Sequence, residues 1–233
     1  MQTWCEKIDC INQVRSKLNM ETINSWNEIK WTIVDQTVFR LQLRIYKAAT
    51  EKKLEKMYKL QKTLVSSKFA KYLAVRRVTQ DNTRGIPSPK EKFDLANKLL
   101  LKGTSSPIKR TYLVYPSGKR RPLSIPTIEN GAKQMLAYLA ICPQWEAHFE
   151  ANRGQDSMKA VLLGIGKKPK WVLDVEISKC FDEINHQYLL DKCETYPQMQ
   201  KQIRAWLKAG ILYSLEYAFA EMGTPQGRII SPL

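Results

Sequence analysis

The sequence predicts an α+β protein in which a basic, helical N-terminal region precedes a region of mixed strands and helices. Apolar residues at spacings of three and four between Trp31 and Val75 indicate amphipathic helices. Farther along, β-prone residues flank a Pro-Ser-Gly turn at 116–118, a pattern typical of a hairpin. With 233 residues, of which 43% are hydrophobic, the chain is long enough to bury a core.

The N-terminal helices are predicted to bury one face each. The first helix has an inward stripe made of Val34, Val38, Leu41, Ile45 and Ala48. The second has an inward stripe made of Leu54, Met57, Leu60 and Leu64. Lysines and arginines occupy the outer faces, and this is the first sign of a charged binding surface.

The charge balance favours a polyanionic partner. Lys and Arg number 38 against 22 Asp and Glu, a formal net charge of +16, and contacts to phosphates add affinity through counterion release. A solvated basic face is the alternative, but acidic partners at helical spacing are scarce, with Glu51 and Glu55 the main candidates. We therefore predict that a nucleic acid contacts Arg40, Arg44, Lys47, Lys56, Lys59, Lys68, Arg76 and Arg77.

The later elements follow from turn signals and periodicity. Gln80–Lys90, with two prolines, is predicted to be a loop and a subdomain hinge. The hairpin is predicted to begin at Thr111 and to end near Pro126, and a strand is predicted from Trp171. Further helices are predicted at 91–101, 130–149, 181–192 and 198–209, and a further strand at 213–220.

Several further features of the sequence predict no functional site. The five cysteines form no CxxC pair, so reduced thiols and no metal site are expected. No apolar run approaches the length of a membrane span, so no membrane partner is expected. His186 is predicted to be a packing residue at a helix start. The tryptophans predicted to anchor the core are Trp31, Trp145, Trp171 and Trp206.

Seven blocks in order resemble the reverse transcriptase and maturase proteins encoded by group II introns, most closely the cyanobacterial and plastid type. The blocks are SWNEIKW from Ser25, LQLRIYKA from Leu41, AVRRVTQDN from Ala74, RPLSIPT from Arg121, EISKCFDEINH from Glu176, AWLKAG from Ala205 and GTPQGRIISPL from Gly223. The resemblance implies the fingers and an incomplete, truncated palm of a right-hand polymerase, with a metal-binding YADD strand, a thumb and a maturase region expected beyond Leu233. It divides the chain into an N-terminal extension (1–24), a helical N-terminal reverse-transcriptase domain (25–82) and fingers with a partial palm (83–233).

The resemblance also places remnants of a catalytic site. Glu176 occupies the slot of the family's first catalytic aspartate, and Asp174 occupies the preceding acidic position. The extra methylene of glutamate displaces the carboxylate in a site where Mg²⁺ requires near-octahedral geometry, and such a displacement can cost about 10²-fold in rate. No confident catalytic or metal residue follows for this chain alone. Mg²⁺ is expected only where a complete polymerase site is assembled.

Four residues resemble the family's nucleotide-contacting positions. Arg121 matches a triphosphate-contacting arginine, and the terminal loop retains Pro225, Gln226 and Gly227. The family's lysine in the preceding hairpin is replaced, because Leu113-Val114-Tyr115 stands there. The resemblance thus weakens the expectation of polymerase activity while keeping that of RNA binding.

The leading hypothesis is therefore a maturase-like protein that binds group II intron RNA, a remnant of an intron-encoded reverse transcriptase that assists splicing. One alternative is half of a split RNA-directed DNA polymerase, completed by a second polypeptide. Another is a decayed intron reading frame without function. A plastid (chloroplast stroma) is the expected location from the resemblance, with the bacterial cytoplasm or a mitochondrion as alternatives.

Overall fold

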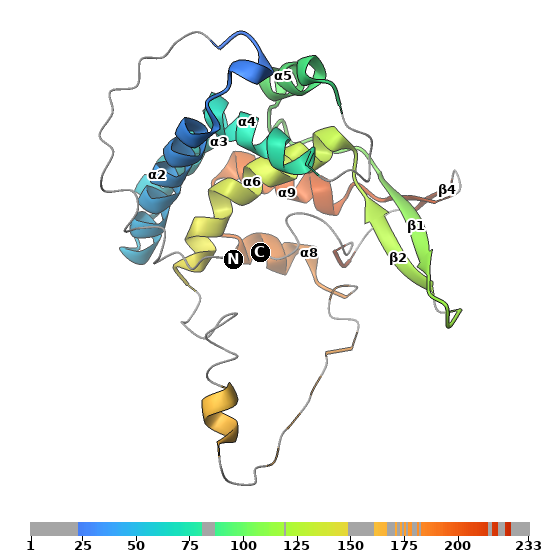
Figure 1. Cartoon of the computed structure of the whole chain (residues 1–233). Coiled ribbons are helices and arrows are strands. Elements are labelled where there is room, and N and C mark those ends of the chain that lie inside the picture. The colour runs from blue at the N-terminus through green and yellow to red at the C-terminus, as the bar shows by residue number, and fades with distance from the viewer. Residues whose placement is uncertain are drawn as a thin grey trace.

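A computed structural model describes residues 23–80, 87–118, 120–148, 161–166 and 183–213, together with shorter stretches at 171, 173, 175, 177, 178, 181, 216–218 and 222–224. In this part of the chain helices gather around a central helix, α6, and a small sheet lies to one side (Figure 1). The predicted α+β class is confirmed.

The N-terminal helices follow the predicted apolar stripes. Val34, Val38, Ile45 and Ala48 are buried on α2, and Met57, Leu60 and Leu64 are buried on α3. The prediction that Leu54 points inward is wrong, since its side chain is 46% exposed. Leu54 is the first residue of α3, where the helix has just left the corner after α2. The bounds are η1 Trp26–Glu28, α2 Trp31–Thr50, α3 Leu54–Ser66, α4 Lys68–Val78 and α5 Pro89–Lys98.

The link between α2 and α3 is a tight corner of three residues. Lys52 adopts φ 54°, the left-handed conformation that commonly ends a helix. Its N–H donates to the carbonyl of Ala49, and the N–H of Lys53 donates to that of Ala48, both at 2.9 Å. These two bonds satisfy carbonyls at the end of α2 and fix the direction in which α3 departs.

Helix caps set the starts of α5 and α6. Ser88 and Glu91 form a reciprocal capping box, with Pro89 in the first turn, so α5 begins two residues before the predicted start. The α6 helix spans Ile128–Glu146, and the Thr127 hydroxyl accepts from the N–H of Asn130 at 3.2 Å. Of the predicted hinge at 80–90, residues 81–86 lie outside the described residues.

Helix α6 joins the N-terminal helices to the rest of the fold. Leu136, Leu139 and Ala140 of α6 are buried, and α6 contacts α2, α3 and α4. Gln42 of α2 donates a hydrogen bond to the carbonyl of Leu139 at 2.9 Å. The core is therefore shared between the N-terminal helices and the segments that follow them in sequence.

The sheet confirms the predicted hairpin and corrects the last predicted strand. Strand β1 (Ile108–Val114) pairs antiparallel with β2 (Arg120–Ile125) across the Pro-Ser-Gly turn. The single strand predicted at 213–220 is instead a hairpin of β3 (Ile211–Tyr213) and β4 (Glu216–Ala218), because the chain reverses between Tyr213 and Glu216. The strand order is β2-β1-β3-β4, with β1 and β3 parallel.

Two helices lie between the predicted strand at Trp171 and β3. The α8 helix (His186–Lys192) is shorter than the predicted helix at 181–192, because Asn185 caps its start by accepting from the N–H of Tyr188 at 3.0 Å. The α9 helix (Pro197–Leu207) matches the prediction at 198–209 within a few residues. Its inward residues Met199, Ile203 and Trp206 are buried in the core.

The predicted strand from Trp171 is not seen. Trp171, Leu173, Val175 and Ile177, the residues of this segment that the structure describes before the turn at 178, are exposed and outside any strand. Alternating apolar residues favour a strand, but a strand forms only where a neighbouring strand accepts its hydrogen bonds. The prediction that Trp171 anchors the core is wrong for the same reason. Trp206 is buried as predicted, and Trp31 and Trp145 are partly buried against the core.

A buried polar network joins α3, α6 and the link between α8 and α9. The Gln61 amide donates to the side-chain oxygen of Gln144 at 2.8 Å, and the Thr195 hydroxyl donates to the Gln61 oxygen at 3.3 Å. The Gln144 amide donates to the carbonyls of Cys193 and Glu194 at 3.4 and 3.2 Å. The three polar side chains are almost wholly buried. Their hydrogen bonds therefore fix how the N-terminal helices sit on the later segments.

Candidate nucleic-acid interface

The predicted RNA-binding residues lie on three helices. Arg40, Arg44 and Lys47 recur at i, i+4 and i+7 and so share one face of α2. Arg44 and Lys47 are exposed, whereas Arg40 is partly buried and interacts with other residues. Lys56 and Lys59 are exposed at i and i+3 on α3. These two helices thus present two short basic stripes joined by the tight corner.

The corner gathers lysines around one carboxylate. The ammonium of Lys53 lies 2.9 Å from a carboxylate oxygen of Glu51. Its hydrogen bond and charge lower the pKa of Glu51, and the charges of Lys56 and Lys47 lower it further. Lys47 of α2, Lys53 of the corner and Lys56 of α3 therefore lie near the same acid. The two acids of the corner, Glu51 and Glu55, cannot neutralise the ammonium groups of Lys47, Lys52, Lys53 and Lys56, so the corner keeps a positive field.

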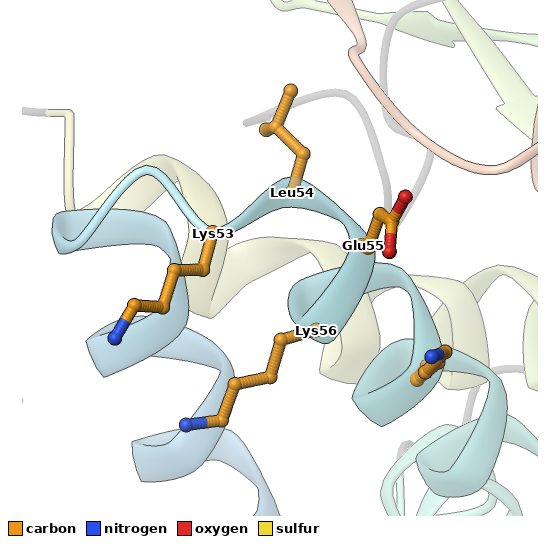
Figure 2. A pocket seen from close by; sticks show the side chains of 5 residues that line it. Lys53, Leu54, Glu55 and Lys56 are labelled. Atoms are coloured by element: carbon orange, nitrogen blue, oxygen red, sulfur yellow. The ribbon is translucent and has the colours of Figure 1, made fainter.

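The corner also forms a shallow, open hollow of about 450 Å³. Lys53, Leu54, Glu55, Lys56 and Lys59 line it. Figure 2 shows Lys53 and Lys56 extending to the same side, over the ribbon of α2, while Leu54 points the opposite way. An open surface that presents adjacent ammonium groups suits an extended polyanion better than an enclosed small molecule.

The basic residues of α4 do not join the corner as a single cluster. Lys68 begins the helix and Arg77 lies in its last turn, about 13 Å farther along the axis at 1.5 Å per residue. Both side chains are exposed. The charge of Lys68 acts on its neighbour Lys71, whose pKa is lowered first by burial and second by that charge.

Arg76 has intramolecular partners that the sequence did not reveal. Its guanidinium carbon lies 4.5 Å from the ring centroid of Trp31, a cation–π geometry. One of its nitrogens lies 3.7 Å from a carboxylate oxygen of Asp35. Arg76 thus ties α4 to the start of α2. RNA contact by Arg76 stays a prediction.

Most of the remaining cations have no acidic partner. Among the described residues, no carboxylate lies within ion-pair distance of Arg44, Lys47, Lys56, Lys59, Lys68 or Arg77. The ion pairs there include those of Lys53, Arg76 and Lys133. The scarcity of acidic neighbours inferred from the sequence is therefore found in the folded protein.

The predicted catalytic and nucleotide-contacting residues lie mostly outside the described residues. This applies to Asp174, Glu176, Pro225, Gln226 and Gly227. The backbone of Arg121 is part of β2 and pairs with Leu113, but its side chain is outside the description. The roles of these residues stay predictions.

The beginning of the terminal loop is tied to the segment before α8. The N–H of Gly223 donates to the carbonyl of Ile184 at 2.9 Å, and the N–H of Thr224 donates to that of Phe181 at 2.7 Å. The Nε2 of His186 lies 2.7 Å from the carbonyl oxygen of Gly223, so Nε2 carries the proton that is donated. His186 thus holds the loop to the start of α8, which agrees with its predicted structural role.

The predicted RNA-binding set omitted two lysines, one at the corner before α3 and one on α3. Lys53 binds Glu51 at the corner, and Lys62 places its ammonium 5.3 Å from the ring centroid of Tyr196. Both continue the i, i+3 spacing of Lys56 and Lys59, and this spacing could have identified them from the sequence. No such signal marked Tyr196, because it lies 134 residues beyond Lys62 in the sequence.

Two absences among the described residues bear on other classes of site. No group of three or more His, Cys, Asp or Glu side chains in this part of the chain has a geometry suited to a metal ion. The Mg²⁺ prediction depends on residues outside it. None of the helices in the described ranges combines the length and the apolar character that crossing a bilayer requires.

Two family profiles match this chain. The N-terminal domain of reverse transcriptase matches residues 26–99, which contain η1 and α2 to α5. Reverse transcriptase (RNA-dependent DNA polymerase) matches residues 108–233, more than half of the chain. The first match covers the basic helices, and the second begins at the first residue of β1.

Several curated proteins are similar to the chain. The group II intron-encoded protein LtrA of Lactococcus lactis subsp. cremoris is 32% identical over 138 residues, which cover 54% of this chain and 23% of that protein. Protein YkfC of Escherichia coli (strain K12) is 27% identical over 142 residues, covering 54% and 37%. Maturase-like protein 1 of Euglena longa is 26% identical over 199 residues, covering 75% and 44%.

The chain spans less than half the length of each of these three relatives. The matches nevertheless agree with the resemblance carried by the seven sequence blocks, and the profiles cover both the helical N-terminal region and the segment from β1 onward. The chain belongs to the reverse transcriptase (RNA-dependent DNA polymerase) family and is related to intron-encoded reverse transcriptases and maturases.

Proposed function

We propose that this chain is a maturase-like protein that binds group II intron RNA and assists its splicing. The observation that carries the proposal is the basic surface of α2 and α3, where exposed lysines outnumber the acids and three of them act on Glu51. RNA is the polyanion proposed because the chain is similar to a group II intron-encoded protein and to a maturase-like protein.

Electrostatics supplies the binding energy in this proposal. Each phosphate that a lysine neutralises releases counterions, so affinity falls with salt by about 0.7–0.9 logarithmic units per contact for each tenfold rise in salt. Lys56 and Lys59 line the open hollow and have no acidic partner among the described residues. They do not have to break an ion pair before contacting phosphate.

The variant Lys56→Gln/Lys59→Gln tests the proposal with a group II intron transcript as the probe. Losing two phosphate contacts is expected to flatten the plot of log affinity against log salt by about 1.4–1.8 and to weaken binding by on the order of 10-fold near physiological salt. Fluorescence anisotropy over a salt series gives both values. Splicing of the same transcript with wild type and variant tests the maturase role.

The matched control is Lys90→Gln/Lys192→Gln, which removes the same charge from exposed positions on α5 and α8. It is expected to change the slope by much less than the α3 pair. Equal losses in both variants would mean that net charge alone attracts RNA, and the α2–α3 surface would then have no special role. A salt-independent affinity for the wild type would contradict the proposal as a whole.

A second candidate is a split RNA-directed DNA polymerase. It is favoured by the alternating apolar residues Trp171, Leu173, Val175 and Ile177, which are all exposed and carry the period of a strand that pairs with another strand. Primer extension on an RNA template separates the candidates. Magnesium-dependent synthesis only after a second polypeptide is added supports the split enzyme. Synthesis by this chain alone contradicts the idea that another polypeptide is required.

A further inference from the structure

Helix α9 presents a second basic face, on the part of the chain matched by the polymerase profile. Its inner side buries Met199, Ile203 and Trp206. Its outer side carries Lys201 and Arg204 at i and i+3, and Lys208, the C-cap residue, continues the same face at i+7; all three are exposed. Residues at this spacing share one face of a helix. The face spans about 10 Å along the axis, or about three steps of 3.4 Å along a nucleic-acid strand.

The loop at 101–104 adds a fourth cation to this face. The buried Gln202 of α9 accepts from the N–H of Gly103 at 2.8 Å and donates to the carbonyl of Thr104 at 3.0 Å. Gln198, one turn earlier, donates to the carbonyl of Leu101 at 2.8 Å. Lys102 is exposed, and both backbone neighbours that flank it are held against α9.

Gly103 brings this loop close to the charged face. It has φ +75°, and a Cβ on it would lie 2.7 Å from Cγ of Lys201. The aliphatic stem of Lys201 therefore lies directly against the loop backbone. The loop, α9 and their lysines form one continuous surface, which we call the α9 basic surface (Lys102, Lys201, Arg204 and Lys208).

In the part of the chain that the structure describes, no acid forms an ion pair with this surface. Neither α9 nor residues 101–104 contain Asp or Glu, and none of the four cations forms an ion pair within the described ranges. Cations near the end of a helix stabilise it through the helix dipole. That effect accounts for Arg204 and Lys208, but it does not account for Lys102, which is outside the helix, or for Lys201 in its first half.

We propose that the α9 basic surface is a second binding site for the phosphate backbone of RNA, separate in sequence from the α2–α3 surface. The RNA partner is taken from the proposed function, which this inference extends. Contacts at both surfaces let one chain hold two segments of a folded RNA. In Figure 1, α9 lies behind α6, whereas α2 and α3 stand at the opposite end of the helical assembly from the β1–β2 hairpin.

The test uses Lys201→Gln/Arg204→Gln in the whole chain, because glutamine keeps the first methylenes that pack on Gly103. With an intron transcript, the salt slope is expected to fall by about 1.4–1.8, as for Lys56→Gln/Lys59→Gln, and the two pairs are expected to be additive. The control is again Lys90→Gln/Lys192→Gln, which removes the same charge elsewhere. Circular dichroism and thermal unfolding of each variant verify the fold.

A second measurement needs no variant. Acylation of lysines in the wild-type chain, read by mass spectrometry with and without the transcript, is expected to show protection of Lys102, Lys201 and Lys208. Lys90 and Lys192 are expected to react equally in both samples. Protection of lysines on α3 without protection on α9 would overturn the inference.

The outcomes separate this inference from the proposed function. If the α9 pair behaves as the control does while the α3 pair weakens binding, the second site is refuted and the proposed function stands. If only the α9 pair weakens binding, the α2–α3 site is refuted and the α9 site stands. If the α9 pair loses binding to vesicles of phosphatidylserine and phosphatidylcholine in equal amounts, with unchanged RNA affinity, the surface binds anionic lipid and the RNA assignment is wrong.

Discussion

Replacement of Gln144 by leucine is expected to lower the free energy of unfolding by about 3 kcal/mol or more. The substitution keeps most of the volume but removes every hydrogen bond of the side chain. It leaves the buried Gln61 amide without its partner, at a cost of about 1–3 kcal/mol. It also removes part-buried hydrogen bonds to the carbonyls of Cys193 and Glu194, which contribute about 0.5–1.5 kcal/mol each. Equilibrium unfolding in guanidinium chloride measures the change.

Two controls isolate the role of the network. Gln187 is exposed on α8, so Gln187→Leu is expected to change stability by no more than about 0.5 kcal/mol. A double-mutant cycle between Gln61→Leu and Gln144→Leu is expected to show coupling, because each loses its bond to the other. A Gln144→Leu protein as stable as wild type would show that the network contributes nothing.

Replacement of Gln202 by leucine is expected to destabilise the fold by about 2–4 kcal/mol. Gln202 is fully buried and serves two backbone groups of one loop, the N–H of Gly103 and the carbonyl of Thr104. Leucine satisfies neither group, and because both hydrogen bonds are part-buried each loss is expected to cost about 1–2 kcal/mol. Thermal and denaturant unfolding give the size of the loss.

Gln198 provides the matched control for Gln202. It lies one turn earlier on α9, makes one hydrogen bond to the same loop and is exposed. Water can replace that bond, so Gln198→Leu is expected to cost about 1 kcal/mol or less. If the two variants were equally stable, burial of Gln202 would not matter for holding the loop.

Local signals predicted the elements whose partners are near in sequence. The stripe from Val34 to Ala48 predicted α2, because helical periodicity is a property of the segment itself. The turn at 116–118 predicted the β1–β2 hairpin, because turn geometry sets the pairing of adjacent strands. The strand at Trp171 and the single strand at 213–220 were wrong, since their pairing depends on distant segments or on a reversal with no Gly or Pro.

The basic surfaces, too, could be predicted only where they depend on residues that are near in sequence. The charge on α2 and α3 was predicted from composition and spacing, and the folded protein keeps it exposed. The gathering of Lys47, Lys53 and Lys56 around Glu51 depends on the left-handed backbone at Lys52, which no sequence rule requires of a lysine. The α9 basic surface was not predicted, because the loop that carries Lys102 is held to α9 by hydrogen bonds between residues about 100 positions apart in sequence.

The contacts of α3 hold together two parts of the chain that are distant in sequence. Gln61 and Lys62 meet Thr195 and Tyr196, two pairs of adjacent residues that belong to different family profiles. The border between those profiles, near residue 100, therefore does not separate two structurally independent parts of the fold. If a protease cleaves the chain near residue 100, the two fragments are expected to stay bound to each other through these contacts of α3. They are then expected to co-migrate until a denaturant separates them.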